Sequence, residues 1–269
     1  MLVFPEWENF ACENLPGPTF AKISFVRMVL FLNEEEHNMT EICLVPGHAC
    51  LRGENPLDEK DWILEPFQQD GGHHARCFAG HFRVGLTWLE TNPEGRLIFT
   101  GGFTRPGTKR SEAESYLLAA QKLGLISDRS LFKRIVLEEY ARDSMENVLF
   151  GVAAAFAAIR TRITRVVAVG FEFKRSRFLD HFASLQLGPG TRYDYFGINN
   201  PMEPQLSQAI VGEANTRKAF ASKSPEAKVS LRAKREARTF GERHVPYVEL
   251  CREWPALHAR LVEWTTENP

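Results

Sequence analysis

Residues that could carry chemistry follow four short apolar runs of the sequence. In chain order they are Gly47, His48, Gly101, Gly102, Glu112, Glu138, Ser144, Asn147, Lys174 and Arg177. Histidine and carboxylate side chains can move protons, and glycines let backbone amides approach an anion. Lysine and arginine hold negative charge on a ligand. This combination predicts a site for an anionic small molecule.

Two of these residues are the candidates for proton transfer, and we predict them to be catalytic. His48 comes directly after the first apolar run, where a general acid or base could stand. Glu112 lies beside Ser111, which forms a capping-box spacing with Glu114 and therefore leaves Glu112 without a capping role. A lone histidine at the end of a strand is also common as a structural hydrogen-bonding group, so that alternative stays open for His48.

The other eight candidates are predicted to bind the ligand. For Gly101 and Gly102 the alternative is a tight turn with a positive φ angle. Ser144 also follows Asp143 in the spacing of a helix cap. Lys174 and Arg177 would both begin a helix, where positive charge opposes the helix dipole. An anion between the two cations would remove that cost, whereas simple solvation of both side chains is the competing interpretation.

Several common signatures are missing from the sequence. It contains neither GxGxxG nor GxxxxGK[ST], and it has no GxSxG motif. It also has neither HExxH nor CxxC, so we predict no metal. His74 and His81 are seven residues apart beside Phe78, and we expect them to pack in the core rather than hold a metal ion.

Short apolar runs typical of buried strands alternate with segments of helical period, and this alternation predicts the fold that positions these residues. The apolar runs cover residues 42–45, 97–99, 135–137 and 166–169, with a weaker run at 193–196. Segments of helical period lie between them, at 75–90, 112–123, 144–160 and 174–185. Strand and helix in alternation are typical of a parallel sheet covered on both faces. We therefore predict a Rossmann-like three-layer α/β sandwich, with the carboxyl ends of its strands along one edge.

Three parts of the chain are expected from this pattern. They are an N-terminal extension over residues 1–40 that packs on the core, the Rossmann-like core domain over 41–200, and a helical, partly basic appendage over 201–269. An insertion over 51–72 is long enough to have a function or a fold of its own. Residues 215–243 hold nine Lys or Arg and three Asp or Glu. They could form a solvated face, bind a partner, or supply cations to a ligand at the sheet edge.

Composition excludes several classes of protein. Among 269 residues there are 33 basic and 34 acidic ones, so the chain is no globally basic nucleic-acid binder and we expect no nucleic-acid partner. Its five cysteines are odd in number, which favours a reducing compartment over a disulfide framework. The apolar stretch over 20–32 is interrupted by Lys22 and Arg27 and is too short to span a bilayer. We expect a cytoplasmic protein without a membrane partner.

The ordered set of loops resembles the SanA/YdcF-like family, a domain of unknown function, over about residues 41–200. The motifs are Pro46-Gly47-His48, Thr100-Gly101-Gly102, Ser111-Glu112-Ala113, Ser144-Met145-Glu146-Asn147, and Lys174 with Arg177. The family pattern has Ser at Thr100, Thr at Ser144 and His at Lys174. The insertion and the appendage resemble a soluble, eukaryotic branch. The resemblance implies a Rossmann-like fold and S-adenosyl-L-methionine as the most specific cofactor candidate, and it assigns no reaction.

Together these observations predict a cytosolic protein that binds an anionic, nucleotide-like small molecule at the carboxyl edge of a parallel sheet. One alternative is a hydrolase or transferase that acts on a phosphorylated or other anionic substrate, with Glu112 or His48 as the base. Another is a non-catalytic interaction protein that uses the basic segment over 215–243. The sequence leaves open whether the protein is an enzyme.

Overall fold

The computed structural model describes residues 40–69, 71–126, 128–222, 224–240 and 244–268. These residues belong to one compact unit, Met39–Pro269. The expected N-terminal extension, apart from Thr40, and the apolar stretch over 20–32 lie outside the described residues.

A five-stranded sheet forms the centre of this unit, and all its strands are parallel. Its strands are β1 (Glu41–Pro46), β4 (Arg96–Thr100), β5 (Ile135–Glu138), β6 (Arg165–Phe171) and β7 (Arg192–Asn199). Each predicted apolar run lies in one of them, so all five predicted strands are confirmed. Their apolar runs suit a sheet buried on both faces.

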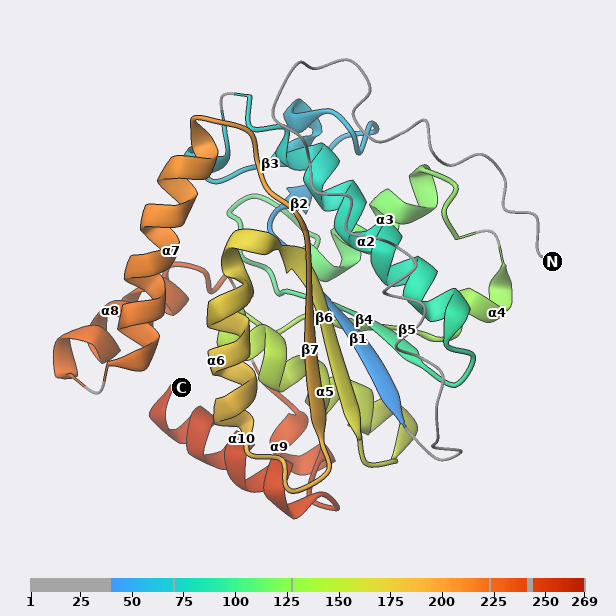
Figure 1. Ribbon diagram of the computed structural model, residues 1–269, viewed down its shortest axis with the longest axis vertical. Coiled ribbons are helices and arrows are strands. Elements are labelled where there is room, and N and C mark those ends of the chain that lie inside the picture. Colours follow the sequence, from blue (N-terminus) through green and yellow to red (C-terminus); the bar gives the residue numbers. More distant parts are fainter. Residues whose placement is uncertain (1–39, 70, 127, 223, 241–243, 269) are drawn as a thin grey trace. The chain divides into compact units, whose positions relative to one another are not determined.

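Helices cover both faces of the sheet and bury one hydrophobic core on each. On one face lie α2 (His74–Thr91) and α3 (Glu112–Lys122). On the other lie α5 (Ser144–Ile159) and α6 (Arg175–Leu185), backed by α9 (Tyr247–Leu250) and α10 (Pro255–Glu267). Figure 1 shows α2 and α6 on opposite sides of the sheet. The fold is a Rossmann-like three-layer α/β sandwich, as the sequence predicts.

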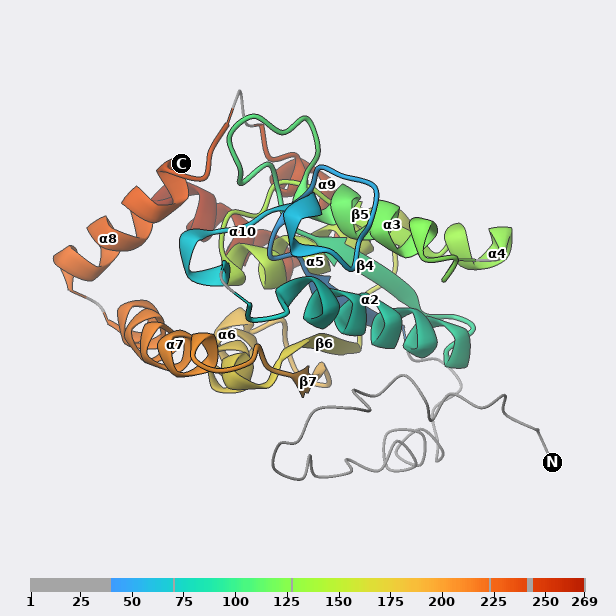
Figure 2. The same ribbon diagram turned by 90° about the horizontal axis from the view of Figure 1, so that it is seen from above.

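Several shorter elements connect the strands and helices of the sandwich. The insertion over 51–72 forms a small hairpin of β2 (Cys50–Leu51) and β3 (Trp62–Ile63), with 3-10 turns η2 (Glu59–Asp61) and η3 (Pro66–Gln68). A short helix, α4 (Arg129–Phe132), precedes β5, and a 3-10 turn, η4 (Glu172–Lys174), leads into α6. Beyond the sheet, α7 (Gln205–Ala221) lies beside α6 and is followed by α8 (Pro225–Glu236) (Figures 1 and 2).

Strand order determines where the sheet can hold a ligand. The order is β5-β4-β1-β6-β7, so the chain builds outward from β1 to β4 and β5 and then returns to the other side of β1. The loops after β1 and β6 therefore leave the sheet in opposite directions and open a crevice between them. His48 follows β1 and Lys174 follows β6, which places both predicted residues at this switch point.

Candidate functional site

A cavity of about 660 Å³ lies at the switch point. Seven of the ten predicted site residues line it, namely Gly47, His48, Glu112, Ser144, Asn147, Lys174 and Arg177. Gly101, Gly102 and Glu138 are not in its wall. Seven further charged residues line it, namely Glu65, Arg105, Arg142, Asp143, Glu213, Lys234 and Arg238.

His48 and Lys174 meet at the floor of the cavity, where Lys174 Nζ lies 3.4 Å from His48 Nδ1. The ammonium group also lies over the rings of Phe171 and Phe173, 5.1 and 5.6 Å from their centroids. Burial, together with the positive charge of Arg177, lowers the pKa of Lys174 to about 7. Burial lowers the pKa of His48 well below its usual range, and Lys174 lowers it further. His48 is therefore neutral at pH 7, and a negatively charged ligand would favour the charged form of Lys174.

His74 and His81 lie behind His48 in the core. The ring of His81 is edge-on to His48 at 5.4 Å and to Phe171 at 4.6 Å. Its Nε2 atom lies 2.8 Å from Asn199 Oδ1. Because the amide group of Asn199 donates to the Cys77 carbonyl, Oδ1 faces His81 and accepts from it. Packing of both histidines in the core is confirmed, and in the described part of the chain no group of His, Cys, Asp and Glu could hold a metal ion.

Glu112 faces the cavity at the start of α3, and its side chain is 7% exposed. Its carboxylate accepts from the Thr104 hydroxyl and lies 3.5 Å from Arg105 Nη1. Arg105 also pairs with Glu65 at 3.1 Å and donates to the His48 carbonyl at 2.9 Å. Glu112 is therefore part of an ion-pair network that holds the insertion against the loop after β1.

The backbone amides of the three glycines are engaged with carbonyl groups. Gly47 donates to Thr100, Gly101 to Glu138 and Gly102 to Ala141, at 2.7, 2.9 and 2.7 Å. Gly101 has a φ of 142°, and a Cβ atom there would lie 2.8 Å from Glu112 Cβ. The expected anion cradle of free amides at Gly101 and Gly102 is wrong, because these amides connect neighbouring loops and the glycines allow close packing.

Glu138 also lies behind the cavity wall, with a side chain that is fully buried. It accepts from the Thr100 hydroxyl at 2.6 Å and from the backbone N–H of Tyr140 at 2.7 Å. Burial raises the pKa of Glu138 to about 7. These contacts hold the loop after β5, and Glu138 lies outside the cavity wall.

Helix α5 begins at the cavity with Ser144, after Asp143 as the N-cap residue. Asp143 accepts from the N–H groups of Met145 and Glu146, both at 3.0 Å. Ser144 Oγ lies 2.8 Å from His181 Nε2 and accepts from Arg177 Nη1 at 3.0 Å. Arg177 is not simply solvated, because it forms an ion pair with Glu213 of α7 at 2.7 Å.

The basic appendage folds back over this edge of the sheet. Arg235 of α8 pairs with Asp143 at 2.8 Å, and each side chain is 4% exposed. Two residues of the same segment, Lys234 and Arg238, then lie in the cavity wall, and Arg238 pairs with Glu65 at 3.0 Å. Among the interpretations of the basic segment, this geometry favours the supply of cations to the sheet edge.

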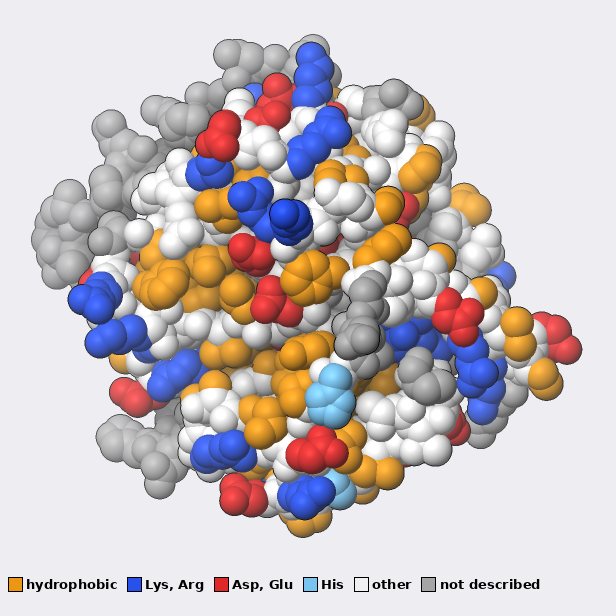
Figure 3. Space-filling model, turned by 180° about the vertical axis from the view of Figure 1, so that it is seen from behind, with side chains coloured by type: hydrophobic (Ala, Val, Ile, Leu, Met, Phe, Trp, Pro, Cys, Tyr) orange, Lys and Arg blue, Asp and Glu red, His pale blue; other side chains and the backbone are white. Residues whose placement is uncertain are grey.

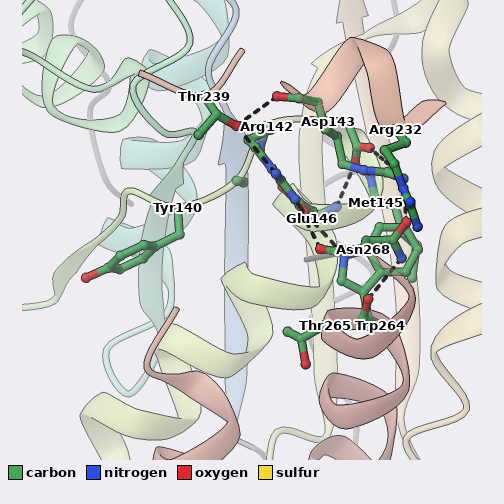
Figure 4. A network of polar contacts seen from close by, with 12 residues as sticks. Tyr140, Arg142, Asp143, Met145, Glu146, Arg232, Thr239, Trp264, Thr265 and Asn268 are labelled. Carbon is green, nitrogen blue, oxygen red and sulfur yellow. Dashed lines mark hydrogen bonds and ion pairs between the residues drawn. The ribbon is translucent and has the colours of Figure 1, made fainter. Parts of the chain in front are cut away.

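A second buried ion pair joins the loop after β5 to α5, and residues of the C-terminal segment contact both of its members (Figure 4). Arg142 contacts both oxygens of Glu146, at 3.0 and 2.7 Å. Trp264 Nε1 donates to Glu146 at 3.3 Å, and the Asn268 carbonyl accepts from Arg142 at 3.4 Å. The C-terminal helix therefore holds the cavity wall through charge-assisted hydrogen bonds.

Lys234 and Lys174 are the two lysines of the cavity wall, and neither forms an ion pair within the described residues. Burial, together with the charges of Arg238 and Arg177, lowers the pKa of Lys234 to about 8. Both lysines are half-buried, so their charge is only partly screened by water. They give the cavity an unbalanced positive charge.

The outer surface is mixed in character. On the face shown in Figure 3, hydrophobic side chains lie among charged ones of both signs, and the described residues form no continuous basic patch there. No helix within the described ranges has the length and apolar character that crossing a bilayer requires.

Comparison with known proteins gives one distant relative. The chain is 25% identical to an uncharacterized protein of Saccharomyces cerevisiae over 272 aligned residues, which cover 79% of this chain and 88% of the yeast protein. No protein-family model matches the chain, and no solved structure matches it. The similarity therefore extends over most of both chains, and it does not indicate an activity.

Sequence reasoning did not single out Arg105, which lies in the loop between β4 and α3, or Glu65, which lies in the insertion. It did offer the basic segment as a source of cations, and that segment contributes Lys234 and Arg238 to the cavity wall. The net charge of the segment over 215–243 was a signal for the last two. No sequence signal distinguishes Arg105 from an ordinary surface arginine.

Proposed function

We propose that this chain binds an anionic, phosphate-bearing, nucleotide-like small molecule in the cavity at the carboxyl edge of the sheet. The observation that carries the proposal is the pair of half-buried lysines, Lys174 and Lys234, which line one cavity without an ion-pair partner among the described residues. Two desolvated cations are costly unless an anion offsets them. A phosphate group carries charge and acceptors for both.

Exposed aromatic side chains at the cavity support a flat group on the ligand. Phe67 and Phe240 line the cavity and are 54% and 43% exposed. Each lies two residues beyond a member of the Glu65–Arg238 ion pair, which connects their two segments at 3.0 Å. Exposed aromatic rings near a cationic site are suited to stack on a nucleobase. The phosphate would lie near the lysines and the base near these rings.

Charge also bears on which nucleotide-like ligand is favoured. S-adenosyl-L-methionine, the candidate that the family resemblance adds, carries a positive sulfonium and a positive amino group. Two lysines without ion-pair partners favour a phosphorylated ligand over such a cation.

We also propose that the chain is related to the SanA/YdcF-like family, which the order of its loops supports. We further propose a cytoplasmic location, without a membrane or nucleic-acid partner.

Calorimetric titration tests this proposal with adenosine monophosphate, adenosine diphosphate and S-adenosyl-L-methionine as probes. We expect the diphosphate to bind, and Lys174→Met or Lys234→Met to weaken it by about 1.5–3 kcal/mol, the magnitude of a charge-assisted hydrogen bond. Lys228→Met is the matched control, because Lys228 is exposed on the same helix as Lys234 and is not in the cavity wall. Unchanged affinity in both cavity variants would contradict the proposal, and tighter binding of S-adenosyl-L-methionine would favour that ligand instead.

A further inference from the structure

Ser144 lines the cavity, and His181 lies behind it in contact with its hydroxyl. Ser144 Oγ lies 2.8 Å from His181 Nε2, and it accepts a hydrogen bond from Arg177 Nη1 at 3.0 Å. A guanidinium group can only donate, so a lone pair of Oγ faces Arg177. The hydroxyl hydrogen is then available to His181 Nε2. Burial, then Arg177, lowers the pKa of His181 to about 3, so the ring is neutral and can accept this hydrogen.

The hydroxyl of Ser144 is not needed to begin the helix. Asp143 is the N-cap, and its side chain accepts from two N–H groups of the first turn. Ser144 occupies the first position of α5 and lines the cavity. Its Oγ therefore lies beside the positive end of the helix dipole and beside Arg177, and both stabilise negative charge on that oxygen.

We propose that Ser144 is a nucleophile that attacks the phosphorus of a phosphate monoester held in this cavity, with His181 as the base that takes its proton. The inference rests on the proposed function only for the class of ligand. The serine, its base and the arginine beside it come from α5 and α6, whereas the lysines come from η4 and α8.

The reaction balances without a further reactant except water. Ser144 Oγ forms a bond to phosphorus, its proton passes to His181 Nε2, and the bond from phosphorus to the ester oxygen breaks. The leaving alkoxide takes the proton from His181 and departs as an alcohol. Water then attacks the phosphoserine, His181 accepts its proton and returns it to Ser144 Oγ, and inorganic phosphate is released.

Electrostatics in the cavity suit this sequence of steps. Arg177 is the second cause of the lowered pKa of His181, after burial, and a phosphate dianion beside Arg177 would oppose that part of the shift. Lys174 and Lys234 line the same cavity and can hold the non-bridging oxygens as charge develops. Asn147 lies one helical turn after Ser144 in the same wall and offers a neutral amide.

Diisopropyl fluorophosphate tests the nucleophile directly, because an activated serine displaces fluoride from its phosphorus. We expect one adduct per chain, located on Ser144 by peptide mass spectrometry, and none on that peptide in Ser144→Ala. His181→Gln should label at least tenfold more slowly. Ser184→Ala is the matched control and should label as the wild type, since Ser184 Oγ contacts only the backbone carbonyl of His181 and the sulfur of Met145.

Two results would overturn the assignment: no Ser144 adduct in the folded wild type, or an adduct that forms equally fast in His181→Gln. If His181→Gln does not fold, the presence or absence of a Ser144 adduct in the wild-type protein still tests whether Ser144 is a nucleophile. Inorganic phosphate should slow labelling, and a lack of protection would remove the monoester as substrate. The probe is uncharged, so its reaction with Ser144 does not depend on binding of an anion. If Ser144 is labelled but the protein does not bind nucleotides, only the proposed function is contradicted. If the protein binds nucleotides but Ser144 is not labelled, only its assignment as a nucleophile is contradicted.

Discussion

Lys174 Nζ and His48 Nδ1 lie 3.4 Å apart although 126 positions of sequence separate them. They meet because β1 and β6 are neighbours in the sheet and the chain leaves these two strands in opposite directions. The lysine contacts a neutral histidine and two phenylalanine rings, and Glu213 only partly offsets the effect of burial and of Arg177 on its pKa. The contact therefore makes the charge of Lys174 sensitive to pH near neutrality.

Ligand affinity is expected to depend on pH through this lysine. The pKa of Lys174 is lowered to about 7, so a rise in pH from 6 to 8 removes the cation that a phosphate needs. Adenosine diphosphate should therefore bind more weakly at pH 8 than at pH 6, measured by calorimetry. The difference should shrink in Lys174→Met. A pH dependence that is the same in the variant and the wild type would assign the titration to another group.

The same lysine should affect folding stability with a defined sign. In the unfolded chain its pKa returns to its usual 10.5, so between pH 7 and 10.5 the unfolded state binds a proton that the folded state does not. The free energy of unfolding gains a contribution that rises with pH across this window. Lys174→Met should be most stabilising relative to wild type at or below pH 7, and this advantage should shrink toward pH 10, measured by denaturant unfolding.

Arg235 is expected to attach α8 to the core. Its ion pair with Asp143 is buried, and Asp143 also caps α5. Arg235→Ala leaves that carboxylate without its cation and should destabilise the protein by about 3–5 kcal/mol. Arg232→Ala, an exposed arginine of the same helix that bonds only to the Glu267 carbonyl, should cost much less. Equal destabilisation by the two changes in thermal melts would contradict the attachment.

Two glycines of the cavity wall should respond to a methyl group in opposite directions. A Cβ atom at Gly47 would lie 2.5 Å from Glu112 Cβ, so Gly47→Ala should destabilise the fold by about 1–3 kcal/mol. Gly212 lies inside α7 with no atom within 4 Å of such a Cβ. Gly212→Ala should therefore stabilise the helix by about 0.5–1 kcal/mol. Denaturant unfolding of both variants checks the pair, and destabilisation by Gly212→Ala would show that α7 packs more tightly than described.

The alternation of periodicities determined the fold class, because strand and helix periods are local properties of the chain. The predicted strand at 166–169 lies in β6, and the predicted helix at 144–160 agrees with α5 to one residue. The right-handed crossover rule then placed His48 and Lys174 at one edge. In the same way, Ser144 was expected at the start of a helix, and it begins α5.

Tertiary structure alone decided which of those residues meet, because strand order is a property of the whole sheet. The pairing of β1 with β6 brings His48 to Lys174, and the return of α8 brings Lys234 to the same cavity. Contacts also decided between the two interpretations of Gly101 and Gly102, since their amides bond to carbonyls more than thirty residues further along the chain. The Ser144–His181 contact joins two helices, and periodicity within one helix cannot show which side chain of another will face it.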